Sequence, residues 1–206
     1  MAGLDTLLAK SLDSIIRENL GKKTLEKIEK RLFERYGINL TQSIEEFTKL
    51  DSVLREFFGE GAEGLERQYF ESMVTIEQES KTLNQNWITL EAPSLAKLIL
   101  GALGDEDKRN ILNAALDEPR IIPDILDITK ISRTIGYGKI NSLIDNGLLV
   151  VQGNAISPDG KNANKYKSIF EDISLDFEKN KVVIKVLLAK ESIEKSSIIQ
   201  VARCNR

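Results

Sequence analysis

Hydrophobic residues recur every three or four positions along residues 1–74, a spacing that places them on one face of an α-helix. Gly21 and Gly37 follow the first two apolar stripes and are expected to end those helices, because glycine adopts the left-handed C-terminal conformation at low cost. Ser43 and Glu46 match a capping box, which predicts the start of a third helix. A fourth stripe begins at Leu65. The pattern predicts a compact bundle of short amphipathic helices.

The periodicity weakens between residues 75 and 92, where Glu, Gln, Ser, Thr and Asn predominate. We interpret this stretch as a linker, although Trp87 and Ile88 interrupt its polarity and are expected to pack on a neighbouring domain. Two further helices follow. The first begins at Pro93 and ends at Gly104, and the second has acidic residues in its first turn, where they suit the positive end of the helix dipole.

Residues 121–150 carry the most specific pattern in the chain. Pro123 suits the first position of a short helix, and Ser132 is expected to be the N-cap of a second helix that runs to about residue 145 and closes at Asn146 and Gly147. Two short helices joined by a turn of three or four residues are typical of a helix-turn-helix, whose second helix enters the major groove of DNA.

Beyond Gly147 the period changes to that of β-strands. Residues 148–157 and 165–170 are predicted strands around a turn at 158–162, and a second hairpin follows at 173–188. The nearly continuous apolar run of its second strand predicts that both faces are covered, and the segment after it is ambiguous between a helix and a strand. The predicted fold is mainly α with a β-containing C-terminal part: a helical bundle (1–74), a linker (75–92), and a winged helix-turn-helix followed by a β-hairpin (93–206).

Composition limits the chemistry that this chain can perform. It contains no histidine, which removes the commonest general acid/base, the Ser–His and Cys–His nucleophile pairs and the commonest metal ligand. A single cysteine, Cys204, cannot form an internal disulfide. No apolar run approaches the length needed to span a bilayer, and the N-terminus lacks the features of a signal peptide. We therefore expect a cytoplasmic protein that is not an enzyme, with no cofactor, no metal and no membrane partner.

The net charge of −3 conceals a basic region. Residues 130–167 carry six basic residues against two acidic ones, which favours contact with DNA. Arg133 and Lys139 on the second helix are candidates for base-edge or phosphate contacts, and Tyr137 either contacts the DNA backbone or caps the domain core. Three lysines straddle the predicted wing and are candidates for phosphate contacts or a solvated strand face: Lys161, Lys165 and Lys167.

The stretch LGDEDKRNILNAALDEP, followed by IIPDILDITKISRTIGYGKINSLIDNGLLV, is similar to the ArsR-like winged-helix transcription regulators of archaea. The resemblance covers about residues 95–188, and residues 1–74 resemble a helical output or sensor domain that accompanies such regulators in ammonia-oxidising archaea. Gly136 departs from the family pattern, and the thiolate motif of its metal sensors is absent. The resemblance implies a DNA-binding dimer whose reading helix presents Ser132, Arg133, Thr134, Tyr137, Gly138, Lys139 and Asn141.

These observations predict a transcription regulator that reads double-stranded DNA with a helix at about 132–145 and a basic wing at about 158–167. The alternative is a protein-interaction adaptor that uses the winged helix as a docking module. A homodimer is expected, because one winged helix contacts one half-site. Its interface is expected at the apolar faces of residues 95–103 and 182–188. The acidic N-terminal bundle is expected to bind a protein or small-molecule partner, or to reinforce the dimer.

Overall fold

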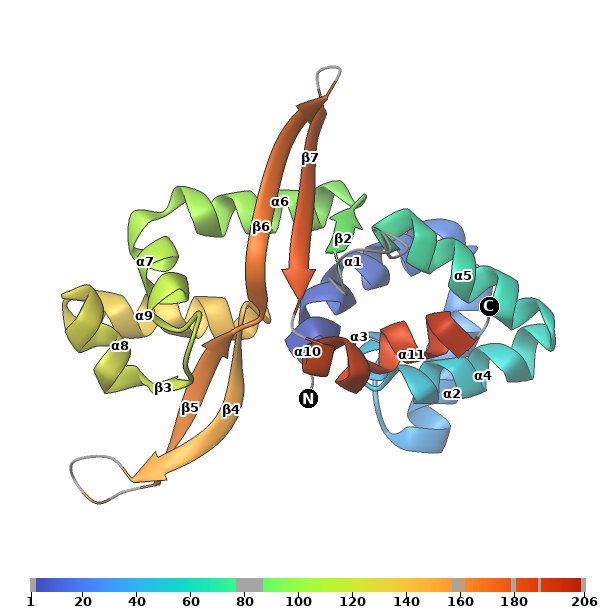
Figure 1. The fold of residues 1–206 in the computed structure, drawn as a ribbon. Coiled ribbons are helices and arrows are strands. Elements are labelled where there is room, and N and C mark those ends of the chain that lie inside the picture. The colour runs from blue at the N-terminus through green and yellow to red at the C-terminus, as the bar shows by residue number, and fades with distance from the viewer. Residues whose placement is uncertain are drawn as a thin grey trace.

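A computed structural model describes residues 3–76, 87–156, 160, 162–178, 181–188 and 190–204 (Figure 1). The protein is mainly helical, with antiparallel sheets formed largely by its C-terminal half. The helices are α1 (Gly3–Asn19), α2 (Lys22–Tyr36), α3 (Leu40–Glu45), α4 (Phe47–Phe58), α5 (Gly61–Met73), α6 (Pro93–Gly104), α7 (Glu106–Ala114), α8 (Ile122–Thr129), α9 (Arg133–Asp145), α10 (Lys190–Lys195) and α11 (Ser197–Cys204). The strands are β1 (Val74–Ile76), β2 (Trp87–Leu90), β3 (Arg120–Ile121), β4 (Leu149–Ile156), β5 (Asn162–Ser168), β6 (Phe170–Glu178) and β7 (Lys181–Leu188).

The third predicted helix is two helices, α3 and α4, and its predicted cap is wrong. The Asn39 side chain accepts a hydrogen bond from the Gln42 amide at 2.9 Å, and the Gln42 side chain accepts one from the Asn39 amide at 3.1 Å. Ser43 is buried inside α3, where its hydroxyl donates to the Leu40 carbonyl. Both polar pairs fit the capping pattern. The helix begins at the earlier pair, Asn39 and Gln42, because Leu40 is buried and extends the apolar stripe by one turn towards the N-terminus.

The end predicted for the second helix is confirmed. Gly37 has a φ of 68°, and its amide donates to the Phe33 carbonyl at 2.9 Å. The helices predicted on either side of residues 130–132 are also present, as α8 and α9. Lys130 makes the turn between them with a φ of 58°, and Ser132 occupies the N-cap position of α9 without a capping hydrogen bond from its side chain.

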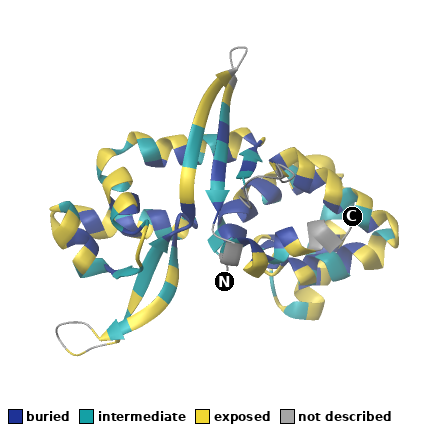
Figure 2. Ribbon diagram, viewed as in Figure 1, coloured by how far each residue is buried: buried dark blue, intermediate teal, exposed yellow. Residues whose placement is uncertain are grey.

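The strands form two antiparallel sheets, with the orders β3-β5-β4 and β1-β2-β7-β6. Strand β2 comes from the stretch expected to be a linker, and it pairs Trp87 with Leu187 and Leu90 with Ile184. Residues 77–86 of that stretch lie outside the described residues. In β7, every second residue from Ile184 to Leu188 is buried and those between are half-buried. Only one face of β7 is therefore fully buried. The outer half of the β6–β7 hairpin also projects from the body (Figures 1 and 2). The expectation that both faces are covered is wrong.

The C-terminal segment is helical and packs on the N-terminal helices. Helix α10 contacts α1, and α11 contacts α3, α4 and α5. The buried carboxylate of Asp5 on α1 accepts hydrogen bonds from the Ser196 hydroxyl and from the amide and hydroxyl of Ser197, the last two at 2.9 Å. Buried residues of both halves belong to one hydrophobic cluster. The division at residues 75–92 stays a prediction, but packing and strand pairing cross it.

Helix α1 also lies against the turn that follows α9. Gly147 has a φ of 71°, and a Cβ at this position would lie 2.4 Å from the Gly3 carbonyl oxygen and 2.7 Å from the Leu7 amide nitrogen. At Gly3, a Cβ would lie 1.8 Å from Cγ1 of Val150. The start of α1 is thus seated directly on the α9–β4 connection, and the absence of a side chain at both glycines permits this close approach.

Candidate nucleic-acid interface

The outer face of α9 carries most of the residues expected to read DNA. Arg133, Thr134, Tyr137 and Asn141 are all exposed, while Gly136, Ile140 and Leu143 are buried on the opposite side. Positions separated by three or four residues share a face of a helix, so these four side chains project together. Ser132 is also exposed, immediately before the helix. Within the described residues, Arg133 forms no ion pair, which leaves its guanidinium available.

Gly136 has a structural explanation in the contact between α8 and α9. A Cβ at this position would lie 2.2 Å from Cδ2 of the buried Leu126 on α8 and 3.5 Å from Cγ2 of Ile131 in the turn. The two helices approach so closely here that the Leu126 side chain fills the space of a side chain at 136. The apolar residue expected at this position is replaced by a neighbour's methyl group, and α9 is continuous through both Gly136 and Gly138.

Lys139 differs from the other candidates because its ammonium group is already bound within the chain. It lies 2.6 and 2.8 Å from the two carboxylate oxygens of Asp105, and 3.0 Å from Asp107. Asp105 is also the N-cap of α7, where it accepts a hydrogen bond from the Lys108 amide at 3.1 Å. Lys139 therefore ties α9 to the start of α7, and its contact with DNA stays a prediction.

This cluster predicts an acid-sensitive contribution to stability. The hydrogen bond from Lys139 holds the pKa of Asp105 below its ordinary value of 3.8. A carboxylate with a lowered pKa stabilises the fold at higher pH, and this contribution is lost as the pH falls through the folded-state pKa. Asp105→Asn keeps a capping side chain but removes the charge. It should lower the melting temperature at neutral pH, and the difference from wild type should shrink below pH 3.8.

Melting curves recorded by circular dichroism across this pH range would check the expectation. Asp107→Asn is the matched control: Lys139 meets one oxygen of Asp107 at 3.0 Å but both oxygens of Asp105 at 2.6 and 2.8 Å, so the effect at Asp107 should be smaller. A difference between wild type and Asp105→Asn that is independent of pH would contradict the assignment.

The β-hairpin expected to form the wing is present. Strands β4 and β5 form a hairpin, and Lys165 and Lys167 lie on one face of β5, paired with Ile121 and Val150 respectively. Both lysines are half-buried, and the described residues provide neither with an ion pair. Lys161, the third lysine expected on the wing, lies outside the described residues. Figure 1 shows the free end of this hairpin on the same side of the molecule as α8.

The sequence analysis missed the exposed apolar residues around this face. Ile135 on α9 is 54% exposed and Ile128 on α8 is 51% exposed. Asp124 and Asp127 are exposed on α8 beside Ile128. An apolar side chain can contact a thymine methyl group in the major groove, whereas carboxylates repel phosphates. The only sequence signal for this exposed apolar surface was that Ile128 and Ile135 lie outside the buried stripes of their helices.

The described residues contain no group of three Cys, Asp or Glu side chains arranged to hold a metal ion. No helix in the same part of the chain combines the length and apolar character required to cross a membrane. The chain matches no protein-family model, no curated protein and no solved structure.

Proposed function

We propose that the chain is a DNA-binding transcription regulator in which residues 93–170 form a winged helix-turn-helix. The exposed face of α9 is the observation that carries this proposal. It presents Arg133, Thr134, Tyr137 and Asn141 in succession, and α9 has no acidic residue before Asp145. Arg pairs bidentately with guanine and Asn with adenine, so this face offers donors and acceptors suited to base edges.

The order of elements supports the same proposal. Helices α6 to α9 are followed directly by the β4–β5 hairpin, and the short strand β3 pairs with β5 before α8 begins. This arrangement is the one expected of the ArsR-like regulators that the sequence resembles, and membership of that family is part of the proposal. Lys165 and Lys167 would contact phosphates, and a cytoplasmic location follows from the function.

A homodimer is retained in the proposal, but with a different contact surface. Residues expected at its interface, including Leu95, Ile99 and Ile184, are buried within the chain. The exposed outer end of the β6–β7 hairpin is the better candidate. There Phe177 is 84% exposed and pairs across the hairpin with Val182, next to the exposed Leu175.

Separating base reading from phosphate contact tests the proposal. A preferred duplex is first selected from random sequence by the wild-type protein. Fluorescence anisotropy then measures binding to that duplex and to a scrambled duplex at several salt concentrations. Arg133→Ala should weaken binding to the selected duplex alone, by about 1–3 kcal/mol. The double variant Lys165→Ala/Lys167→Ala should weaken binding to both duplexes and reduce the salt slope by about 0.9 for each phosphate that is no longer neutralised.

Lys22→Ala/Lys23→Ala provides a control that removes the same charge from the exposed start of α2. It should weaken binding to both duplexes only slightly, as the loss of any two exposed positive charges would. If this control weakened binding as much as the wing variant did, the wing would have no specific role. A wild-type protein that does not bind any duplex at low salt would overturn the proposal.

The protein-interaction adaptor is the second candidate, favoured by the exposed Ile128 and Ile135 beside Asp124 and Asp127 on the same helix pair. Exposed apolar residues rimmed by charge are typical of protein docking sites. In this case the wild-type protein would not bind DNA in a salt-dependent manner.

A further inference from the structure

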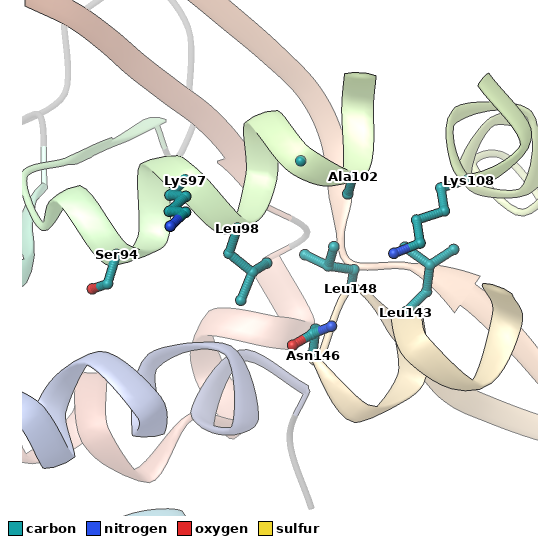
Figure 3. Close-up of a pocket in the computed structure, with 9 residues that line it drawn as sticks. Ser94, Lys97, Leu98, Ala102, Lys108, Leu143, Asn146 and Leu148 are labelled. Carbon is teal, nitrogen blue, oxygen red and sulfur yellow. The ribbon is translucent and has the colours of Figure 1, made fainter. Parts of the chain in front are cut away.

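A cavity of about 380 Å³ lies below α6, between its exposed side and the C-terminal end of α9 (Figure 3). This volume is within the range of small-molecule sites, roughly 300–1,000 Å³. Leu98, Leu143 and Leu148 form its apolar wall, and the last two are buried side chains of the domain core. The cavity therefore has an apolar wall supplied by α6, the end of α9 and the connection to β4, away from the outer face of α9.

Two lysines stand at opposite ends of this apolar wall. Lys97 projects from α6 at one end, and Lys108 reaches in from α7 at the other, with the leucines between them (Figure 3). None of the described residues that line the cavity is acidic. Among the described residues, neither lysine has a carboxylate oxygen within ion-pair distance, and Asp105, the acid near Lys108, is paired with Lys139. Within this part of the chain, Asp105 acts on Lys108 only from beyond ion-pair distance, and no ion pair neutralises either lysine.

A hydrogen-bonded chain orients the polar side of the cavity. The Lys10 ammonium on α1 donates to Oδ1 of Asn146 at 2.8 Å, and Nδ2 of Asn146 donates to the Ser142 carbonyl at 2.6 Å. The Lys108 ammonium donates to the Ser142 hydroxyl at 3.0 Å. An ammonium group has three donors, so Lys108 keeps two for a ligand. The chain adds a third positive charge, Lys10, at the edge of the site.

We propose that this cavity binds a linear organic dianion with two carboxylate ends and a short apolar spacer. One carboxylate would accept hydrogen bonds from Lys97 and the other from Lys108, while the spacer lies on Leu98, Leu143 and Leu148. A single anionic head, such as inorganic phosphate, would satisfy one lysine and leave the apolar wall uncovered. Because the site lies between α6, α7 and the end of α9, and is linked to α1 through Lys10, such a ligand would act as an effector of DNA binding; this regulatory role rests on the proposed function, whereas the binding site does not.

Isothermal titration calorimetry on the full chain without DNA tests the site. The probes are the unbranched dicarboxylates from succinate to suberate, with hexanoate and inorganic phosphate as single-headed comparisons. We expect one bound dicarboxylate per chain, an affinity that passes through a maximum along the series, and at least tenfold weaker binding of hexanoate and phosphate. Binding should weaken as salt is added, because both contacts are ionic.

Two variants make the assignment specific. Lys97→Met removes one exposed charge and should weaken the best dicarboxylate at least tenfold, while reducing its preference over hexanoate. Gly101→Leu fills the cavity and keeps both lysine charges; a Cβ at Gly101 meets no atom within 4 Å, and leucine favours the helix. It should abolish binding while the melting temperature is maintained. Lys23→Met, an exposed lysine on α2, is the matched control and should bind as wild type does.

The site is overturned if no dicarboxylate binds at millimolar concentration, if phosphate binds as well as the best dicarboxylate, or if Lys97→Met and Gly101→Leu bind unchanged. Failure of the proposed function has a different signature. If the protein binds a dicarboxylate but does not bind DNA, the proposed binding site is supported and the proposed function as a regulator is wrong. If the protein binds DNA but no dicarboxylate, the proposed function is supported and the proposed binding site is wrong.

Discussion

Replacing Gly147 by alanine is expected to destabilise the protein by about 3 kcal/mol, the sum of backbone strain and displacement of α1. Its φ of 71° disfavours any residue with a Cβ, and that Cβ would lie 2.4 and 2.7 Å from backbone atoms of Gly3 and Leu7. Backbone atoms cannot rotate away as a side chain can, so α1 has to move. Chemical denaturation followed by circular dichroism would measure the loss.

Two other glycines separate the components of this effect. Gly37 has a similar φ of 68° but a Cβ there would meet no atom within 4 Å, so Gly37→Ala should cost only the strain, about 1–2 kcal/mol. Gly138 lies in α9 with open space around it and no positive φ, and Gly138→Ala should stabilise the protein by about 0.5–1 kcal/mol. A Gly147→Ala variant no less stable than Gly37→Ala would show that α1 is not seated on the α9–β4 turn.

Removing the Asp5 carboxylate is expected to cost about 2–3 kcal/mol and to release α10 and α11 from the N-terminal helices. Asp5 is only 3% exposed and accepts hydrogen bonds from Ser196 and Ser197. In Asp5→Ala the Ser197 amide would be left without its acceptor at the start of α11. Hydrogen exchange followed by mass spectrometry should show faster exchange across residues 190–204, together with a lower melting temperature.

Asp51→Ala is the matched control, because Asp51 pairs with Arg55 one turn away, 2.6 Å from it, on the partly exposed surface of α4. Pairs of this kind contribute about 0.3–0.5 kcal/mol, so exchange in the C-terminal helices should not change. Equal losses in the two variants, without faster exchange at 190–204, would contradict the anchoring role of Asp5.

The candidate DNA-reading face could be predicted only in part from the sequence. The periodicity of α9 separates its buried residues from Arg133, Thr134, Tyr137 and Asn141, because both sets follow from helical geometry. The periodicity did not reveal that Lys139 is bound to Asp105, because 34 residues separate the two partners. Nor did it reveal that Ile135 is exposed, since an isoleucine next to a buried stripe is normally taken as part of the core.

The sequence alone determined the local features of this protein: most of the helical periods, the end of α2 at Gly37, the turn between α8 and α9, and the β4–β5 and β6–β7 hairpins. These features depend on residues a few positions apart, whose backbone preferences and hydrogen bonds are local. Only the tertiary structure decided that β2 pairs with β7, that Asp5 anchors helices 191 residues away, and that two lysines flank one apolar cavity. Those contacts arise when distant segments bury their apolar faces together, and the hydrophobic effect that drives burial is not directional.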